Sequence, residues 1–377
     1  MQTSLAPTEP LIARLTRHAL APVLLYLAVR LIGLVVLAIM AATHDRTLLD
    51  VLISWDSDWY LTIAEHGYAP DQSGLVDAGG NFTPNTTLAF FPGYPKLMGL
   101  IGWLTATSLP FAGLAISLAA GIAAAYGITR LADTRRAGLI CVALFASTPM
   151  AVTLSMVYSE ALFSACAAWA LVGVLERRWW LAVACCVGAG LVRPSAWVLV
   201  AIVIVALVMH ERTYRGVFAA VLCTLGLGGY LLFVADRTMN LFGWFALQKA
   251  GWGTAFDGGA ATGEFVGSVL ASNASVMETA NVLTVLGAVV MCVVVLVCRM
   301  SWPLAVYGIG LVVMTAGSSG VTYSKMRLLV PAFTLLLPIA AGLAKRRTGT
   351  VLAVLAATAL LSGWFGGYAL TAWRYAI

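Results

Sequence analysis

Long runs of apolar residues are the feature that most limits what this chain can fold into. About 20 consecutive apolar residues suffice to cross a bilayer as a helix, and several segments reach that length. Of the 377 residues, 61% are hydrophobic, and the mean hydropathy is +0.93, whereas soluble domains contain roughly 45–50% apolar residues. In lipid only helices or closed barrels satisfy the backbone, and continuous rather than alternating runs select helices. The sequence therefore predicts an all-α polytopic membrane protein.

Eleven apolar segments are expected to form spans. They cover 20–42, 111–131, 137–155, 157–176, 179–192, 195–209, 214–235, 280–298, 302–317, 327–344 and 349–371. A twelfth, 89–106, is expected to be a short, partly embedded helix. Proline removes a backbone donor, so Arg193-Pro194 should break the chain into a hairpin of two tilted spans with its tip near the outer face. We thus expect about 11 to 12 transmembrane helices in a single domain, 1–377.

Basic residues gather in short connections, and this predicts the orientation of the chain. Cytoplasmic loops carry an excess of Lys and Arg. If the N-terminus is cytoplasmic and 89–106 does not cross, five clusters all lie inside: Arg130/Arg135/Arg136, Arg177/Arg178, Arg212/Arg215, Arg299 and Lys345/Arg346/Arg347. Residues 1–19 hold Arg14, Arg17 and His18, and the first apolar run after them, which is too long for a signal-peptide core, is expected to be a retained signal anchor. The protein is thus expected in the plasma membrane, with the long loops 43–88 and 236–279 on the extracytoplasmic side.

Charge and cysteine usage exclude several classes of protein. The formal net charge is +6, but no basic stripe with interleaved aromatic residues is present, so no nucleic-acid partner is expected. All seven cysteines lie in apolar runs. Their spacing predicts neither a disulfide framework nor a metal site.

The stretch SWDSDWYLTIAEHGY, residues 54–68, concentrates charge in a chain with only 10% charged residues. A helix capped by Ser54 would place Asp56 and Asp58 about 200° apart, at 100° per residue. Two carboxylates so placed do not readily chelate one metal. The stretch is therefore either a site or a helix start whose acids favour the positive end of the helix dipole. Its Trp and Tyr residues are expected to anchor the helix at the membrane interface.

Other polar residues stand at the ends of spans on the same predicted side. Glu160 begins an apolar helix, where a carboxylate is costly unless it is paired or faces water, so it is either a site residue or a first-turn helix acid. Arg193 lies at the predicted break, and a guanidinium suits bidentate phosphate binding. Arg193, Lys325 and Arg327 are predicted to clamp an anionic lipid head group, or else to meet ordinary phospholipid.

Two sequence blocks show a family resemblance. WDSDWYLTIAEHGY at 55–68, followed by AFFPGYP at 89–95, resembles the signature of the PIG-V-like mannosyltransferases, which add the second mannose in GPI-anchor synthesis, and of their bacterial relatives. YSEALF, GLVRPSA, LQKAGW and SKMRLLVPAF look like later blocks of this family. The abundance of Arg, Ala, Val and Gly is typical of a GC-rich genome, so a bacterial, actinobacterial-type member is expected.

The resemblance implies a GT-C fold whose first outer loop carries amphipathic helices, and an enzyme that uses a polyprenyl-phosphate sugar. It matches Trp55-Asp56 to an essential Trp-Asp pair, so Asp56 is the expected catalytic base, with Asp58 and Glu160 as weaker catalytic candidates. The donor phosphate is expected to contact Arg193, Lys325 and Arg327. The residues expected to form the substrate loop and its framework are Trp55, Glu65, His66, Tyr68, Phe91, Pro92, Gln248 and Trp252.

The expected reaction is inverting transfer of mannose from polyprenyl-phosphate mannose to a lipid-linked or glycolipid acceptor. No cofactor is expected, because protein cations can stabilise a phosphate leaving group, although a divalent metal stays an open alternative. Membrane lipids are the other expected partners. Two further interpretations stay open: a transporter or flippase for a lipid-linked sugar, and a GT-C transferase for another sugar.

Overall fold

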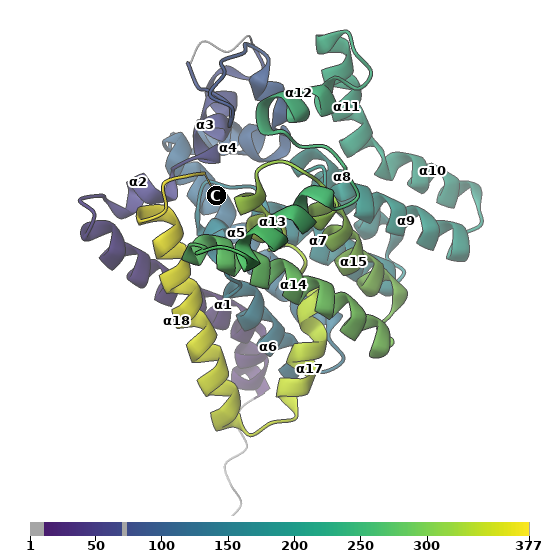
Figure 1. The fold of residues 1–377 in the computed structure, drawn as a ribbon. Coiled ribbons are helices and arrows are strands. Elements are labelled where there is room, and N and C mark those ends of the chain that lie inside the picture. Colours follow the sequence, from purple (N-terminus) through teal and green to yellow (C-terminus); the bar gives the residue numbers. More distant parts are fainter. Residues whose placement is uncertain (1–10, 70–73, 377) are drawn as a thin grey trace, which may run out of the picture.

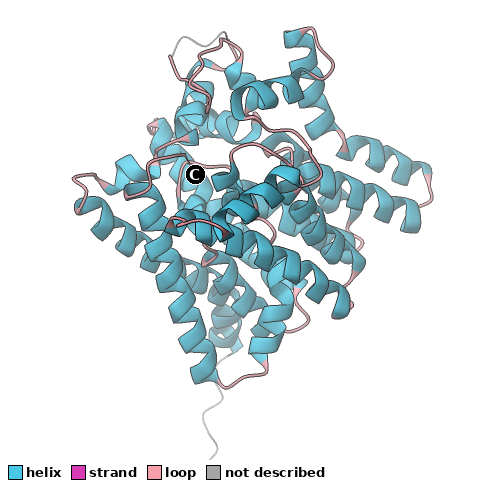
Figure 2. Ribbon diagram, viewed as in Figure 1, coloured by secondary structure: helices cyan, strands magenta, loops and turns pink. Residues whose placement is uncertain are grey.

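The computed structural model describes residues 11–69 and 74–376, and the regular elements of these residues are helices (Figure 2) together with one isolated β-bridge, Phe256 to Ser318. Residues 1–10, which precede the predicted signal anchor, lie outside the described residues. The α-helices are α1 (Leu11–Ala42), α2 (Leu48–Leu52), α3 (Asp56–His66), α4 (Gly93–Thr105), α5 (Leu109–Leu131), α6 (Arg135–Ala146), α7 (Glu160–Leu175), α8 (Trp179–Val192), α9 (Ala196–His210), α10 (Tyr214–Cys223), α11 (Leu225–Thr238), α12 (Gly243–Trp252), α13 (Ala260–Leu270), α14 (Val276–Val297), α15 (Trp302–Ala316), α16 (Lys325–Leu328), α17 (Leu337–Ala344) and α18 (Thr348–Thr371). Four short 3₁₀ helices are η1 (Thr86–Ala89), η2 (Ala151–Ser155), η3 (Thr322–Ser324) and η4 (Phe333–Leu336).

Several helices are long and apolar enough to cross a membrane. Among the described residues these are α1 from Ala19 onwards, α5, α14 and α18, and two bent pairs raise the number from four to six if each pair counts as one span. Four more apolar helices, α7, α8, α9 and α15, have 14 to 16 residues. The predicted all-α, multi-pass membrane architecture is confirmed (Figure 1).

Three apolar segments that the sequence predicts as continuous spans are interrupted. The segment 137–155 is helical only as far as Ala146, and a separate 3₁₀ turn, η2, follows Pro149. The segment 214–235 bends by 47° between α10 and α11, and 327–344 bends by 68° around Pro331. Proline has no backbone N–H to donate and disfavours helix in the residue before it, which accounts for two of the three breaks. By length and composition, the full-length spans are therefore fewer than the 11 to 12 helices expected.

The helix in 89–106 is short, as predicted, and the predicted break at Arg193-Pro194 is present. The segment 89–106 contains only α4, whose 13 residues extend about 20 Å, less than the roughly 30 Å hydrocarbon core. The chain also breaks at Arg193-Pro194, between α8 and α9. The side chain at this break is not at an exposed tip, however, because Arg193 is only 8% exposed.

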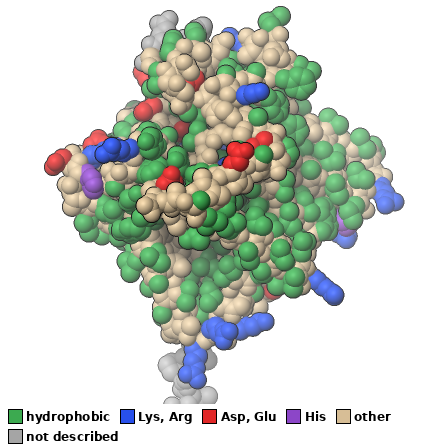
Figure 3. Space-filling model, viewed as in Figure 1, with side chains coloured by type: hydrophobic (Ala, Val, Ile, Leu, Met, Phe, Trp, Pro, Cys, Tyr) green, Lys and Arg blue, Asp and Glu red, His purple; other side chains and the backbone are tan. Residues whose placement is uncertain are grey.

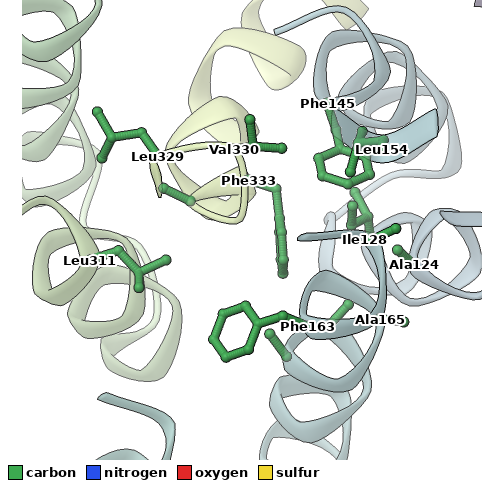
Figure 4. Close-up of a cluster of buried hydrophobic side chains, with 14 of the residues drawn as sticks. Ala124, Ile128, Phe145, Leu154, Phe163, Ala165, Leu311, Leu329, Val330 and Phe333 are labelled. Atoms are coloured by element: carbon green, nitrogen blue, oxygen red, sulfur yellow. The ribbon is translucent and has the colours of Figure 1, made fainter. Parts of the chain in front are cut away.

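The helices pack through small residues and one apolar core. A Cβ atom on Gly173 of α7 would lie 2.6 Å from the backbone nitrogen of Ala182 in α8, so these two helices approach as closely as small residues allow. Figure 4 shows apolar side chains from several helices meeting around Phe333. The ring centroid of Phe333 lies 6.0 Å from that of Phe145 and 5.5 Å from that of Tyr307.

Charged side chains divide the molecule into two ends. In Figure 3, most Lys and Arg groups lie at the lower end, over the turn between α17 and α18, and along the right-hand edge, with a few at the upper left and near the top, and most acidic groups lie in the upper half. Every arginine and lysine of the five predicted inner clusters is exposed. Arg136 also donates from Nη2 to the carbonyl oxygen of Arg346 at 2.9 Å, which joins two of these clusters. The positively charged loops thus share one end of the bundle.

Candidate active site

The predicted catalytic stretch enters α3 through an unusual turn. The structure corrects the expected N-cap: α3 begins at Asp56 after Trp55, and Ser54 Oγ instead donates to the carbonyl of Val51 at 2.9 Å. Trp55 has φ 62° and ψ −120°, a conformation that costs a bulky residue about 1–3 kcal/mol and often occurs at functional sites. The backbone N–H of Asp56 donates to the hydroxyl of Tyr158 at 3.2 Å. This contact holds the start of the helix against the core.

The side chain of Asp56 is paired with an arginine from the other end of the sequence. Arg327 Nη1 donates to Asp56 Oδ2 at 2.7 Å, and their side chains are 11% and 20% exposed. The guanidinium also lies over the ring of Tyr158, 5.2 Å from its centroid, where a cation is attracted by the aromatic face. Tyr158 therefore supports both members of the ion pair.

Glu160 completes a buried cluster of four charges. Its side chain is 1% exposed, and its Oε1 atom lies 2.5 Å from Nη1 of Arg193 and 3.6 Å from Nε of Arg327. Neither oxygen of this carboxylate makes a hydrogen bond of good geometry with the described residues, so the contacts of Oε1 are ion pairs. The charges thus alternate in the order Asp56, Arg327, Glu160, Arg193, and this pairing offsets the large cost of burying each one.

The short bent segment 156–159, just before α7, positions this cluster. Ser159 Oγ accepts a hydrogen bond from Arg193 Nη1 at 3.2 Å and lies 2.9 Å from the hydroxyl of Tyr60 in α3. Two residues earlier, Val157 donates its N–H to the carbonyl of Leu52 at 3.1 Å. The predicted site residues did not include the hydroxyl groups of Tyr60, Tyr158 and Ser159, although two of them directly precede Glu160 in YSEALF.

Side chains of α11 and α12 donate hydrogen bonds to the backbone of the AFFPGYP segment. The carbonyl of Phe90 accepts from the hydroxyls of Tyr68 at 2.7 Å and Tyr230 at 2.6 Å. The carbonyl of Ala89 accepts from Gln248 Nε2 at 3.0 Å. Side chains from α11, from α12 and from the turn after α3 therefore satisfy the backbone where this segment passes from η1 to α4.

Aromatic rings fill the space between α3, the AFFPGYP segment and α12. Trp59 stacks on Phe90 with centroids 5.5 Å apart, and Trp252 meets Phe90 edge-on at 5.5 Å. Trp59 and Tyr60 are only 6% and 7% exposed. The expectation that these two anchor α3 at the membrane interface is therefore wrong: Trp59 packs inside the protein against Phe90 and Trp252, and Tyr60 packs against Phe90 and Tyr158.

The other two framework residues of this segment lie beside these rings. Phe91 packs against Tyr230 at 4.6 Å, and Pro92 is the N-cap residue of α4. Half-buried Trp55 packs against the main apolar core.

Three predicted site residues lie outside the charged cluster. Glu65 and His66 are exposed on α3, where their side chains lie 3.8 Å apart. Asp58 is exposed, and its pKa is raised above the usual value by partial desolvation and by the nearby charge of Asp56. Asp58 has no ion-pair partner among the described residues, unlike Asp56.

Lys325 contacts a different part of the protein from Arg327. It is 3% exposed and donates to Thr262 Oγ1 and, at 2.7 Å, to the carbonyl of Ser318. Both residues lie in the one-turn helix α16, and two residues along a helix differ by about 200° in direction. The three predicted phosphate-binding cations are thus not brought together: Arg193 and Arg327 share Glu160, while Lys325 ties α13 to the 318 loop. Within the described part of the chain, no three His, Cys, Asp or Glu side chains are placed to hold a metal ion.

Solved structures of other proteins resemble this chain in fold. The structure resembles that of ArnT from Cupriavidus metallidurans bound to undecaprenyl phosphate, with a TM-score of 0.54 and 15% identity over 90% of this chain and 63% of that chain. ArnT in the apo state matches with a TM-score of 0.53 and 14% identity, over 93% of this chain and 77% of that chain. At such identity the likeness shows the fold alone, and it confirms the expected GT-C fold. The chain spans less than two thirds of the length of the first of these structures.

The sequence itself provides the closer assignment. A search of curated proteins finds no match. The mannosyltransferase (PIG-V) family, in contrast, matches residues 12–251, well over half of the chain. The matched range contains three of the four clustered charges, Asp56, Glu160 and Arg193. The chain therefore belongs to the mannosyltransferase (PIG-V) family.

Proposed function

We propose that this protein is a glycosyltransferase that moves mannose from polyprenyl-phosphate mannose to a hydroxyl group of a lipid-linked, glycolipid or other extracytoplasmic acceptor. The observation that carries the proposal is the buried cluster of two carboxylates and two guanidiniums around Glu160. The match to the mannosyltransferase (PIG-V) family supports mannose as the sugar. The likeness in fold to ArnT bound to undecaprenyl phosphate supports a polyprenyl-phosphate carrier.

Arg193 and Arg327 are proposed to bind the donor phosphate. Both guanidiniums are held by Glu160, and guanidinium binds phosphate oxygens in a bidentate manner. The phosphate gains negative charge as the glycosidic bond breaks, so cations placed beforehand stabilise the transition state more than the ground state. Lys325 is the weaker candidate, because Thr262 and Ser318 already accept hydrogen bonds from its ammonium group.

Asp56 is proposed as the general base. The acceptor oxygen attacks the anomeric carbon, its proton passes to the Asp56 carboxylate, and the electron pair of the broken C–O bond leaves with the polyprenyl phosphate. A positioned base contributes about 10²–10⁴-fold to such a step. Direct displacement inverts the anomeric centre, so a β-linked donor gives an α-linked mannoside.

Donor binding and base activation are proposed to be linked through Arg327. Arg327 Nη1 contacts one oxygen of Asp56 at 2.7 Å. A phosphate competes for the same guanidinium, so its arrival would free the Asp56 oxygen that accepts the proton. The geometry thus supports an order in which the donor binds before the proton is transferred.

The active site is proposed to face the extracytoplasmic side of the plasma membrane, with the N-terminus in the cytoplasm. The basic loops share one end of the bundle, while α3 and α12 lie at the other end (Figure 1). Positive loops face the cytoplasm, which supports this orientation.

The direct test is incubation of the purified protein with a polyprenyl-phosphate [³H]mannose and candidate glycolipid acceptors. We expect a labelled, α-linked product. Transfer of a different sugar, but not of mannose, would contradict the sugar assignment. Movement of the intact lipid-linked sugar across proteoliposomes without any product would favour the flippase alternative.

A further inference from the structure

Arg30 is a buried charge that the proposed reaction does not use. It is the twelfth of the 24 residues of the α1 span, Ala19–Ala42, and is only 5% exposed. No carboxylate among the described residues pairs with it. An arginine near the centre of a span costs about 2.5–3.5 kcal/mol or more, and such residues are usually functional. The position of Arg30 therefore needs a specific partner.

The partners of Arg30 lie on both sides of the interruption after α6. Nη1 donates to the carbonyl of Ala146, the last residue of α6, at 3.0 Å. Nε donates to Oγ of Ser155, the last residue of η2, at 2.9 Å. The final carbonyls of a helix have no partner within the helix, and a cation at this end is favourable. One guanidinium thus bridges the two ends of the segment that Pro149 interrupts.

The chain beyond this bridge leads directly into the charged cluster. The carbonyl of Met156 accepts from Ser117 Oγ at 2.8 Å. Tyr158 then accepts the N–H of Asp56 and lies beneath the Arg327 guanidinium. Two residues later, Glu160 pairs with both arginines of the cluster. Only two residues separate Ser155 from Tyr158, so a shift at the bridge moves the support of Asp56.

We infer that Arg30 is a positioning residue for the active site. It fixes where the interrupted segment leaves α6, and through residues 156–160 it holds Tyr158 and Glu160 against Asp56, Arg193 and Arg327. The consequence for catalysis rests on the proposed function, whereas the positional role does not.

Arg46 provides a matched control. Its Nη1 donates to the carbonyl of Leu370 near the end of α18 at 2.9 Å, a bond of the same kind and length as that from Arg30 to Ala146. None of the described contacts of Arg46 reaches residues 147–160. A general effect of losing a guanidinium from a helix end should therefore appear in Arg46→Gln as well.

The first experiment measures hydrogen–deuterium exchange of the purified full-length variants in detergent. In Arg30→Gln we expect the amides of residues 156–160 to exchange at least about tenfold faster than in the wild type, with no such change there in Arg46→Gln. Wild-type exchange at 156–160 in Arg30→Gln, or an equal rise throughout the protein, would overturn the inference. If Arg30→Gln fails to fold, Ser155→Ala is used instead, because it removes one of the two hydrogen bonds of Arg30. We then expect a smaller rise in the exchange rate of the amides of residues 156–160.

The second experiment is a double-mutant cycle on transfer by Arg30→Gln and Tyr158→Phe. We expect Arg30→Gln to lower kcat about tenfold with little change in the KM for donor, and the double variant to lose much less than the product of the two single losses, because both act on the support of Asp56. If the loss of kcat in the double variant equals the product of the two single losses, Arg30 and Tyr158 do not act through the same support of Asp56. If the wild type transfers no sugar, the proposed function fails, while the exchange experiment still decides the role of Arg30.

Discussion

Arg327 contacts both carboxylates of the cluster, Asp56 at 2.7 Å and Glu160 at 3.6 Å. Because Glu160 also binds Arg193 at 2.5 Å, the two guanidiniums are held close together by one buried carboxylate. A pair of buried cations that share one carboxylate suits a dianionic or monoanionic phosphate better than it suits an uncharged ligand. The individual side chains thus favour a phosphate-bearing substrate.

A comparison of Arg327→Gln with Lys325→Gln tests this assignment. Arg327→Gln should weaken the binding of undecaprenyl phosphate at least about tenfold, because a bidentate, charge-assisted contact is lost. Lys325→Gln, two residues away, should weaken it less than about threefold, because that ammonium group faces Thr262 and Ser318. The measurement is the Kd of each purified variant for undecaprenyl phosphate. An equal loss of affinity in both variants would show that Lys325 contributes to phosphate binding as much as Arg327 does.

The charged members of the cluster can be found in the sequence, but their pairing cannot. Asp56, Glu160, Arg193 and Arg327 stand out because charge beside an apolar span is costly. Arg30 carries the same cost, yet it lies inside the apolar run 20–42, and its acceptors, a carbonyl and a serine, carry no sequence signal. The separation of Lys325 from Arg327 depends on one turn of helix, which hydropathy does not predict.

At the scale of elements, the site is assembled from the ends of interrupted helices. Pro149, Pro194 and Pro331 each break an apolar segment, and Glu160, Arg193 and Arg327 lie near these breaks. Hydropathy is averaged over a window of about 19 residues. It therefore predicts continuous spans at 137–155 and 327–344 and does not detect the short turns within them. The break at Pro194 was predictable because an arginine precedes the proline.

A close approach between α4 and α8 links the AFFPGYP segment to the break at Arg193. A Cβ atom on Gly93 would lie 2.8 Å from the carbonyl oxygen of Leu191 and 2.9 Å from Val192 Cγ2. Because the backbone of Leu191 cannot easily move away, Gly93→Ala should destabilise the protein by about 1–3 kcal/mol and reduce the rate of mannose transfer.

Gly287→Ala is the control for this prediction. Gly287 lies inside α14, and an added Cβ atom there would meet nothing within 4 Å, so alanine should be neutral or stabilising by up to about 1 kcal/mol. Unfolding of both variants is followed by tryptophan fluorescence in the same detergent. If Gly93→Ala proves as stable as Gly287→Ala, α4 and α8 do not pack this closely.

For the whole molecule, the basic end and the end that carries α3 lie apart (Figures 1 and 3). The fold class was predictable because apolar content and run length are properties of the whole chain. The orientation follows from the sum of many exposed charges rather than from any single residue. A transporter would instead need its charged cluster to be reached from both sides.

Cysteine labelling of intact cells tests this orientation. Ser272→Cys, in the exposed turn between α13 and α14, should react with a membrane-impermeant maleimide, whereas Thr348→Cys, at the exposed start of α18, should react only after permeabilisation. Both variants need a Cys298→Ser background, because Cys298 is exposed. The reverse pattern would place the active site in the cytoplasm.

The most direct measurement compares mannose transfer by purified Asp56→Asn and Asp58→Asn with that of the wild type. Asparagine can still accept the hydrogen bond from Arg327 but cannot take up a proton at this step, so Asp56→Asn should lose at least about 100-fold in kcat while it keeps its thermal stability and its affinity for undecaprenyl phosphate. Asp58→Asn, at an exposed and unpaired carboxylate on the same helix, should stay within a few-fold of the wild type. Near-wild-type transfer by Asp56→Asn, or a greater loss in Asp58→Asn, would show that Asp56 is not the base.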